Sequence, residues 1–223
     1  MKIQFILALI VTTFGISCGG GEPLPAGPSG TSYMTLTAGS SRNYELKNNT
    51  PPATTNTYTT TSSTRDSSIN GRSYRVFTSS MGGSEYYNQS GNDYYTYQIL
   101  PAAIGSTNVE ILFLKDNAAV GTTWLAASAP LTVPGVPFPL TININNTITQ
   151  KGLTKIVNGI SYTDVIHVTS VISVAGLPGG GVTSDIHYYY APKFGLIENS
   201  VILSSSLVPI AVDTDLRLMS ANF

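Results

Sequence analysis

The sequence has one cysteine, two histidines and one tryptophan among 223 residues, and only 10% of its residues are charged. One cysteine excludes an intramolecular disulfide. Ordinary soluble domains contain about 25% charged residues, so uncharged Ser, Thr, Asn, Gly and Tyr must cover much of this surface. The 11 basic and 12 acidic side chains leave a net charge of −1 and form no basic stripe, which argues against nucleic acid as a partner.

Motifs that carry common chemistry are also missing. The chain has no Walker loop, no Cys-x-x-Cys pair and no His-Glu-x-x-His. His167 and His187 would form a metal site only if neighbouring strands brought them together with a carboxylate. We expect Asp185 to point to the opposite face from His187. The sequence therefore predicts no enzyme, no metal and no cofactor.

The N-terminus begins with one basic residue, Lys2, and continues in a mostly apolar run, MKIQFILALIVTTFGISC. This run is shorter than the roughly 20 residues that span a bilayer and is typical of a secretory signal. Gly15 to Cys18 resembles the lipobox of bacterial lipoproteins, although the usual leucine is replaced by Gly15. The resemblance implies a signal peptide over residues 1–17 and acyl chains such as palmitate on Cys18. The alternative is an ordinary signal with an incidental cysteine.

The next segment, GGGEPLPAGPSG, is dominated by glycine and proline. It predicts that residues 18–30 are a lipidated cysteine and a flexible tether. We expect residues 31–223 to form a single domain, because all-β domains of this length are often single units. We also expect the protein to be a monomer.

Alternation with a period of two residues predicts antiparallel strands throughout this domain. In Leu140–Asn145 the apolar residues share one face, and Ile210, Val212, Leu216 and Leu218 repeat the pattern near the C-terminus. Asn70-Gly71 and Asn158-Gly159 predict type I′ hairpin turns, since both central residues need positive φ.

The stretch YYYAPKFG, Tyr188 to Gly195, combines three tyrosines with a turn. Pro192 ends strand pairing and Gly195 suits a left-handed conformation, so local physics predicts a hairpin. Tyr189 to Ile197 resembles the Tyr-Tyr-Ala-x-x-x-Gly-Leu-Val hairpin of half-barrel lipoproteins similar to the lipoprotein-localisation factors. Val120–Trp124 and Val157–Ile166 resemble two further segments of that group, in the same order.

This resemblance implies an all-β fold, in which a curved antiparallel sheet forms an open half-barrel with an apolar concave face. It implies no catalytic residues. The low lysine content and abundant Asn, Thr and Tyr indicate a Gram-negative host of Bacteroidetes type. We expect the protein to be anchored in the cell envelope, at the outer membrane.

Two functions remain open. The first is binding of an apolar ligand or envelope component on the concave face. The second is adhesion to a glycan or protein through tyrosine-rich strands, although tyrosine rows also form ladders that only stabilise a sheet. The ligand-facing candidates are aromatic: Tyr94, Tyr95, Tyr97, Trp124, Phe138, Tyr162, Tyr188 and Tyr190.

Overall fold

The computed structural model describes residues 32–99, 108–131, 139–176, 182–205 and 211–223. Within these ranges the regular structure consists of strands, and no helix is long and apolar enough to cross a membrane. The first six strands are β1 (Ser41–Asn48), β2 (Thr54–Ile69), β3 (Arg72–Ser79), β4 (Ser84–Ser90), β5 (Asp93–Ile99) and β6 (Asn108–Lys115). The other six are β7 (Thr123–Leu131), β8 (Leu140–Val157), β9 (Ile160–Ala175), β10 (Val182–Ala191), β11 (Gly195–Ser205) and β12 (Ala211–Asn222).

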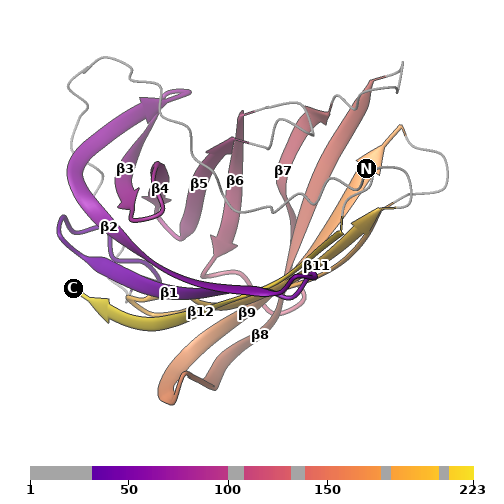
Figure 1. Ribbon diagram of the computed structural model, residues 1–223. Coiled ribbons are helices and arrows are strands. Elements are labelled where there is room, and N and C mark those ends of the chain that lie inside the picture. The colour runs from indigo at the N-terminus through magenta and orange to yellow at the C-terminus, as the bar shows by residue number, and fades with distance from the viewer. Residues whose placement is uncertain (1–31, 100–107, 132–138, 177–181, 206–210) are drawn as a thin grey trace.

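All twelve strands belong to one antiparallel sheet, in the order β6-β5-β4-β3-β2-β1-β12-β11-β10-β9-β8-β7. The first and last strands pair at the centre of this order. The ribbon curls into a trough, with β1 and β12 along its floor and the tip of the β8–β9 hairpin projecting below (Figure 1). The predicted all-β fold with a curved antiparallel sheet is therefore confirmed.

The curl brings the two edge strands, β6 and β7, close to each other. The Trp124 indole Nε1 donates to the carbonyl of Leu112 at 2.8 Å, and Asn146 Nδ2 donates to the carbonyl of Phe113 at 3.3 Å. Val109 of β6 packs with Ala127 and Ala129 of β7. Side chains thus connect the two edges of the sheet where the strand order ends.

The turns form where the sequence predicts them. Asn70 and Asn158 have φ of 52° and 49°, and each is followed by a glycine with φ of 79°. The β10–β11 turn has positive φ at Gly195, as expected, and also at Lys193, where φ is 69°. A lysine rarely adopts this conformation, so the contacts around the turn must hold it there.

Those contacts come from residues 32–36, which we call the strap. The amide of Tyr33 donates to the Tyr94 hydroxyl at 3.0 Å, and the Tyr33 hydroxyl donates to the carbonyl of Asp164 at 2.7 Å. The amide of Lys193 donates to the carbonyl of Ser32 at 2.7 Å. The strap therefore joins β5, β9 and the β10–β11 turn.

Arg42 of β1 binds the strap through hydrogen bonds, and its side chain is buried, with only 2% of the residue exposed. Its Nε donates to the carbonyl of Phe194 at 2.6 Å, and its Nη2 donates to the carbonyl of Thr35 at 2.9 Å. Buried guanidinium groups need such acceptors, because an unsatisfied buried charge is costly. Arg42 therefore ties β1 to both the strap and the turn.

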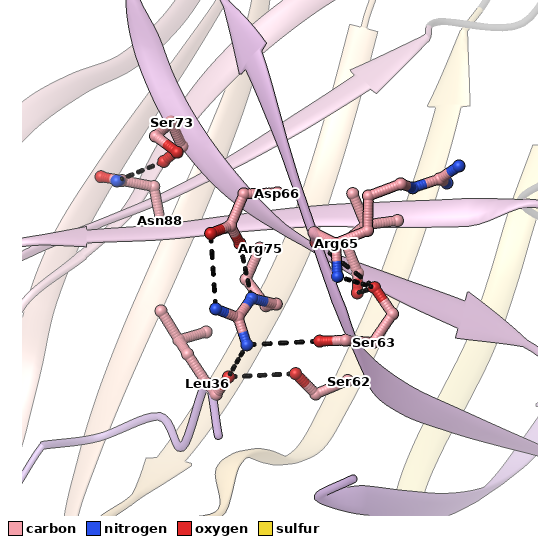
Figure 2. A network of polar contacts seen from close by, with 9 residues as sticks. Leu36, Ser62, Ser63, Arg65, Asp66, Ser73, Arg75 and Asn88 are labelled. Atoms are coloured by element: carbon pink, nitrogen blue, oxygen red, sulfur yellow. Dashed lines mark hydrogen bonds and ion pairs between the residues drawn. The ribbon is translucent and has the colours of Figure 1, made fainter. Parts of the chain in front are cut away.

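A second arginine holds a sharp bend in β2, where the register with β3 shifts between Ser62 and Asp66. Arg75 of β3 forms an ion pair with Asp66 at 2.6 Å and donates to the carbonyls of Leu36 and Ser63 at 3.1 and 3.2 Å. Figure 2 shows these contacts converging on one guanidinium. The bend and the end of the strap therefore depend on the same side chain.

Candidate functional site

The inner face of the sheet is the face that carries the main hydrophobic cluster. Aromatic rings cross it from one wall to the other. Phe113 of β6 lies 5.5 Å from Tyr190 of β10 and 6.2 Å from Tyr87 of β4, between ring centroids. Tyr190 in turn stacks with Tyr188 at 6.2 Å. At this level the protein's own side chains fill the trough.

Beyond this aromatic layer the inner face is lined by apolar side chains that are only half-buried. Strand pairing places Ile142 opposite Val174 and Ile144 opposite Ile172. The half-buried lining comes from β8, β9 and β11 and comprises Ile142, Ile144, Ile172, Val174, Val201 and Leu203. Concave apolar surface that keeps some exposure is typical of a ligand-binding face.

One acid lies on the same face. Glu85 of β4 is paired with Phe77 across the ladder and accepts a hydrogen bond from the Tyr87 hydroxyl at 3.0 Å. Burial raises the pKa of the Glu85 carboxyl above its ordinary value, although the Tyr87 hydrogen bond and the charge of Arg42 act in the opposite direction. A carboxyl with a raised pKa inside a concave site is a marker of function.

The inner tyrosines remain un-ionised at neutral pH. Burial raises the pKa of Tyr188 to about 12, and burial also raises the pKa values of Tyr87 and Tyr190 well above their ordinary range. Their hydroxyl groups therefore act as neutral donors beside an apolar surface. Such hydroxyl groups can orient the polar end of an apolar ligand.

The candidate aromatic residues fall into four groups. Tyr94, Trp124, Tyr188 and Tyr190 belong to or pack against the main inner cluster. Tyr162 lies in a second cluster and packs edge-on against Phe194 at 5.0 Å. Phe138 and Cys18 lie outside the described residues.

The prediction that Tyr95 and Tyr97 face a ligand on the inner side of the sheet is wrong. Both alternate with Tyr94 and Thr96 in the regular β4–β5 ladder, so they lie on the opposite face. There the Arg72 guanidinium stacks 3.6 Å from the centre of the Tyr95 ring and pairs with Glu110 at 3.1 Å. Tyr97 packs near Tyr86, with ring centroids 6.4 Å apart.

A pocket of about 380 Å³ opens beside this group, lined by Asn70, Gly71, Arg72 and Glu110. The Tyr74 hydroxyl donates to the Glu110 carboxylate at its edge. Sequence reasoning missed this site because Arg72 and Glu110 are 38 positions apart and belong to strands that do not pair. The alternation of Tyr95 and Tyr97 with Tyr94 and Thr96 was the one available signal that these rings leave the inner face.

The two histidines meet on the opposite face of β9 and β10. His167 Nε2 lies 2.9 Å from His187 Nδ1, and His187 Nε2 lies 2.8 Å from Asp185 Oδ1. The expectation that Asp185 points away from His187 is wrong, because residues two apart in a strand share a face. A carboxylate can only accept, so His187 Nε2 donates to Asp185, and the other His187 nitrogen, Nδ1, faces Nε2 of His167.

The far nitrogen of His167, Nδ1, is buried without a hydrogen-bond partner. The ring stacks on Tyr189 at 4.3 Å. Burial and the neighbouring charges of His187 and Lys155 lower the pKa of His167 to about 4. The three polar groups form a line instead of converging, and no group of three ligating side chains in the described ranges could hold a metal ion.

No protein-family model matches the chain, and no curated protein matches it. Two solved structures are similar to it. A "putative lipoprotein" from Parabacteroides distasonis is 8% identical, with a TM-score of 0.50 over 86% of this chain and 99% of that chain. A "putative exported protein with YmcC-like fold" from Bacteroides fragilis is 9% identical, with a TM-score of 0.48 over 85% of this chain and 98% of that chain. The first likeness shows that the chain shares the all-β fold of that Parabacteroides structure.

Proposed function

We propose that this protein is a lipid-anchored component of the bacterial cell envelope, at the outer membrane, whose inner sheet face binds an apolar ligand without catalysis. The observation that carries the proposal is the row of half-buried apolar side chains on that face, from Ile142 to Leu203. When a ligand covers such side chains, the removal of apolar surface from water stabilises the complex by about 25 cal/mol per Å².

The anchor is supported by the apolar leader that ends at Cys18. The name "putative lipoprotein" given to the Parabacteroides structure of the same fold supports it further. Metabolic labelling with palmitate tests the anchor: the wild-type protein should carry label in the membrane fraction, and the Cys18→Ala variant should carry none. Equal labelling of both proteins would exclude Cys18 as the anchor.

The ligand is tested with two neighbouring residues of β11. Leu203 lies half-buried on the inner face, whereas Ile202 is 47% exposed on the opposite face. Native mass spectrometry of the protein purified from a Gram-negative periplasm should show a bound apolar molecule. Leu203→Glu should lower its occupancy at least tenfold, and the matched control Ile202→Glu should leave it unchanged. Equal loss in both variants, or a wild-type protein without any bound mass, would contradict the proposal.

A second candidate function, binding of a glycan or protein, is favoured by the pocket beside Arg72 and Glu110. Tyrosine rings with nearby charged hydrogen-bonding groups can stack on and hold a sugar. Tyr87 and Tyr94 belong to the inner core and are poor probes, so the test uses Tyr86, Tyr95 and Tyr97. Their replacement by Ser should abolish retention on a glycan array if this function is correct, and should leave it unchanged if these rings only form a ladder.

A further inference from the structure

The chain enters the described structure at a fixed point. Ser32 Oγ donates to the side chain of Gln89 at 2.7 Å, and the Ser32 carbonyl accepts from the amide of Lys193 at 2.7 Å. Ser32, where the described structure begins, therefore lies beside the β10–β11 turn. Lys193 at this turn is exposed and presents a positive charge next to this point.

The same end of the sheet carries other connections. Alternate connections of an antiparallel meander lie at one end of the strands, so the β4–β5, β8–β9 and β10–β11 turns share this end. The C-terminus joins them, because Asn222 at the end of β12 pairs with Ser41 at the start of β1.

Large exposed apolar side chains gather here. Ile156 and Ile160, on either side of the β8–β9 turn, are 69% and 43% exposed. Met219 and Phe223, at the end of β12, are 37% and 49% exposed. Scattered exposed apolar residues are normal, but a group of them marks an interaction surface.

Direct contacts connect this group of apolar residues to the start of the described structure at Ser32. Asn158, at the tip of β8–β9, donates to the carbonyl of Leu218 at 2.8 Å and lies 3.0 Å from the Met219 sulfur. The Phe223 ring packs on Phe194 at 5.2 Å, the residue that follows Lys193. The β8–β9 tip, the C-terminus and the β10–β11 turn therefore form one continuous end of the molecule.

We propose that this end rests on the lipid surface, with Ile156, Ile160, Met219 and Phe223 inserted among the lipid headgroups and upper acyl chains. The segment between Cys18 and the strap has an average span of about 20 Å if flexible, so an anchored Cys18 keeps this end close to the bilayer. Apolar side chains strengthen such peripheral contact, and Lys193 suits an anionic headgroup. The inference rests on the proposed anchor at Cys18 and is independent of the inner-face ligand.

The test places a tryptophan at the surface of the full-length protein. The protein is purified from membranes in detergent and reconstituted into vesicles of phosphatidylcholine and phosphatidylglycerol with brominated acyl chains, which quench nearby indoles. Ile156→Trp is the probe, and Phe223→Trp is a second probe at the chain terminus. Val171→Trp is the matched control, because Val171 is also an exposed strand residue, at 57%, away from this end. Trp124, the one native tryptophan, is present in every variant. The fluorescence of the wild-type protein measures the emission of Trp124, which is subtracted.

We expect the emission added at Ile156 and Phe223 to be quenched several-fold more strongly than the emission added at Val171. Equal quenching at all three positions, or none beyond the wild-type value, would overturn the proposal. Palmitate labelling of the same preparations separates the two causes of failure. A labelled protein without selective quenching lacks the proposed orientation, whereas an unlabelled protein shows that the anchor itself is wrong.

Discussion

At the scale of single residues, Glu85 places an ionisable group on an apolar inner face. Burial raises the pKa of its carboxyl, so the folded protein binds a proton more readily than the unfolded chain does. The contribution of Glu85 to stability is therefore greatest below the ordinary glutamate pKa and falls as the pH rises through the folded value.

Glu85→Gln should consequently raise the free energy of unfolding at pH 7, with a higher melting temperature. At pH 4 the difference from wild type should become small, because the wild-type carboxyl is then protonated. Urea unfolding of both proteins at the two pH values measures this. A variant that is less stable at pH 7 would instead show that attraction to Arg42 outweighs the cost of burial.

For His167 we expect the opposite dependence of stability on pH. Its pKa is lowered to about 4 in the folded protein, below the ordinary value of about 6.5, because burial disfavours the charged ring and His187 and Lys155 repel it. The stability that depends on the neutral ring is present above pH 6.5 and is lost as the pH falls toward 4.

His167→Gln should therefore flatten the loss of stability between pH 6.5 and pH 4.5. A glutamine amide can still donate toward His187, so the variant retains a hydrogen-bonding group at this position. The measurement is the slope of the unfolding free energy against pH for both proteins. An unchanged slope would mean that His167 is not the group that titrates in this window.

At the scale of elements, local sequence predicted the turns, because positive φ at an Asn-Gly pair is a property of two adjacent residues. Asn158 and Gly159 illustrate this. The alternation of buried Leu216 and Leu218 with exposed Arg217 in β12 was equally predictable. The bend in β2 was not, because Arg75 of another strand and the carbonyl of Leu36 hold it.

Arg75→Met tests this bend. The change removes an ion pair and two hydrogen bonds to carbonyls, and it should lower the free energy of unfolding by about 1–3 kcal/mol, since the remaining partners lose a charged donor. Arg65→Met, an exposed position on β2, is the matched control and should change stability by less than about 0.5 kcal/mol. Similar losses in both variants, measured by urea unfolding, would show that the Arg75 network contributes little.

At the scale of the whole molecule, the curl of the sheet depends on the contact between its two edges. Trp124 supplies the hydrogen bond from β7 to the carbonyl of Leu112 in β6. Trp124→Phe keeps an aromatic ring but removes the donor, and should cost about 1 kcal/mol.

Amide hydrogen exchange measures which strands are destabilised by Trp124→Phe. Amides of β6 and β7 should exchange faster in the Trp124→Phe variant, because these strands gain freedom to separate, while amides of the central pair β1 and β12 should keep their protection. Uniformly faster exchange would mean that Trp124 stabilises the core as a whole and has no special role at the edges.

The candidate site divides in the same way between what was predictable and what was not. The sequence indicated tyrosines of the 94–97 and 188–190 segments as candidates for the site, and the predicted hairpin at Pro192–Gly195 was correct. The list of candidate residues did not separate Tyr94, which faces inward, from Tyr95 and Tyr97, which lie on the opposite face of the sheet. That separation depends on how β5 pairs and on which face of the sheet becomes concave.

The sequence by itself determined the strands and their turns, since alternation and turn chemistry act between residues that are close along the chain. The curved antiparallel sheet was implied only by the resemblance to half-barrel lipoproteins. Tertiary structure alone decided which residues meet across the trough. Phe113 reaches Tyr190, the strap reaches β9, and the edges meet at Trp124. These contacts join residues far apart in sequence, and they arise from sheet curl and register shifts, which no local pattern records.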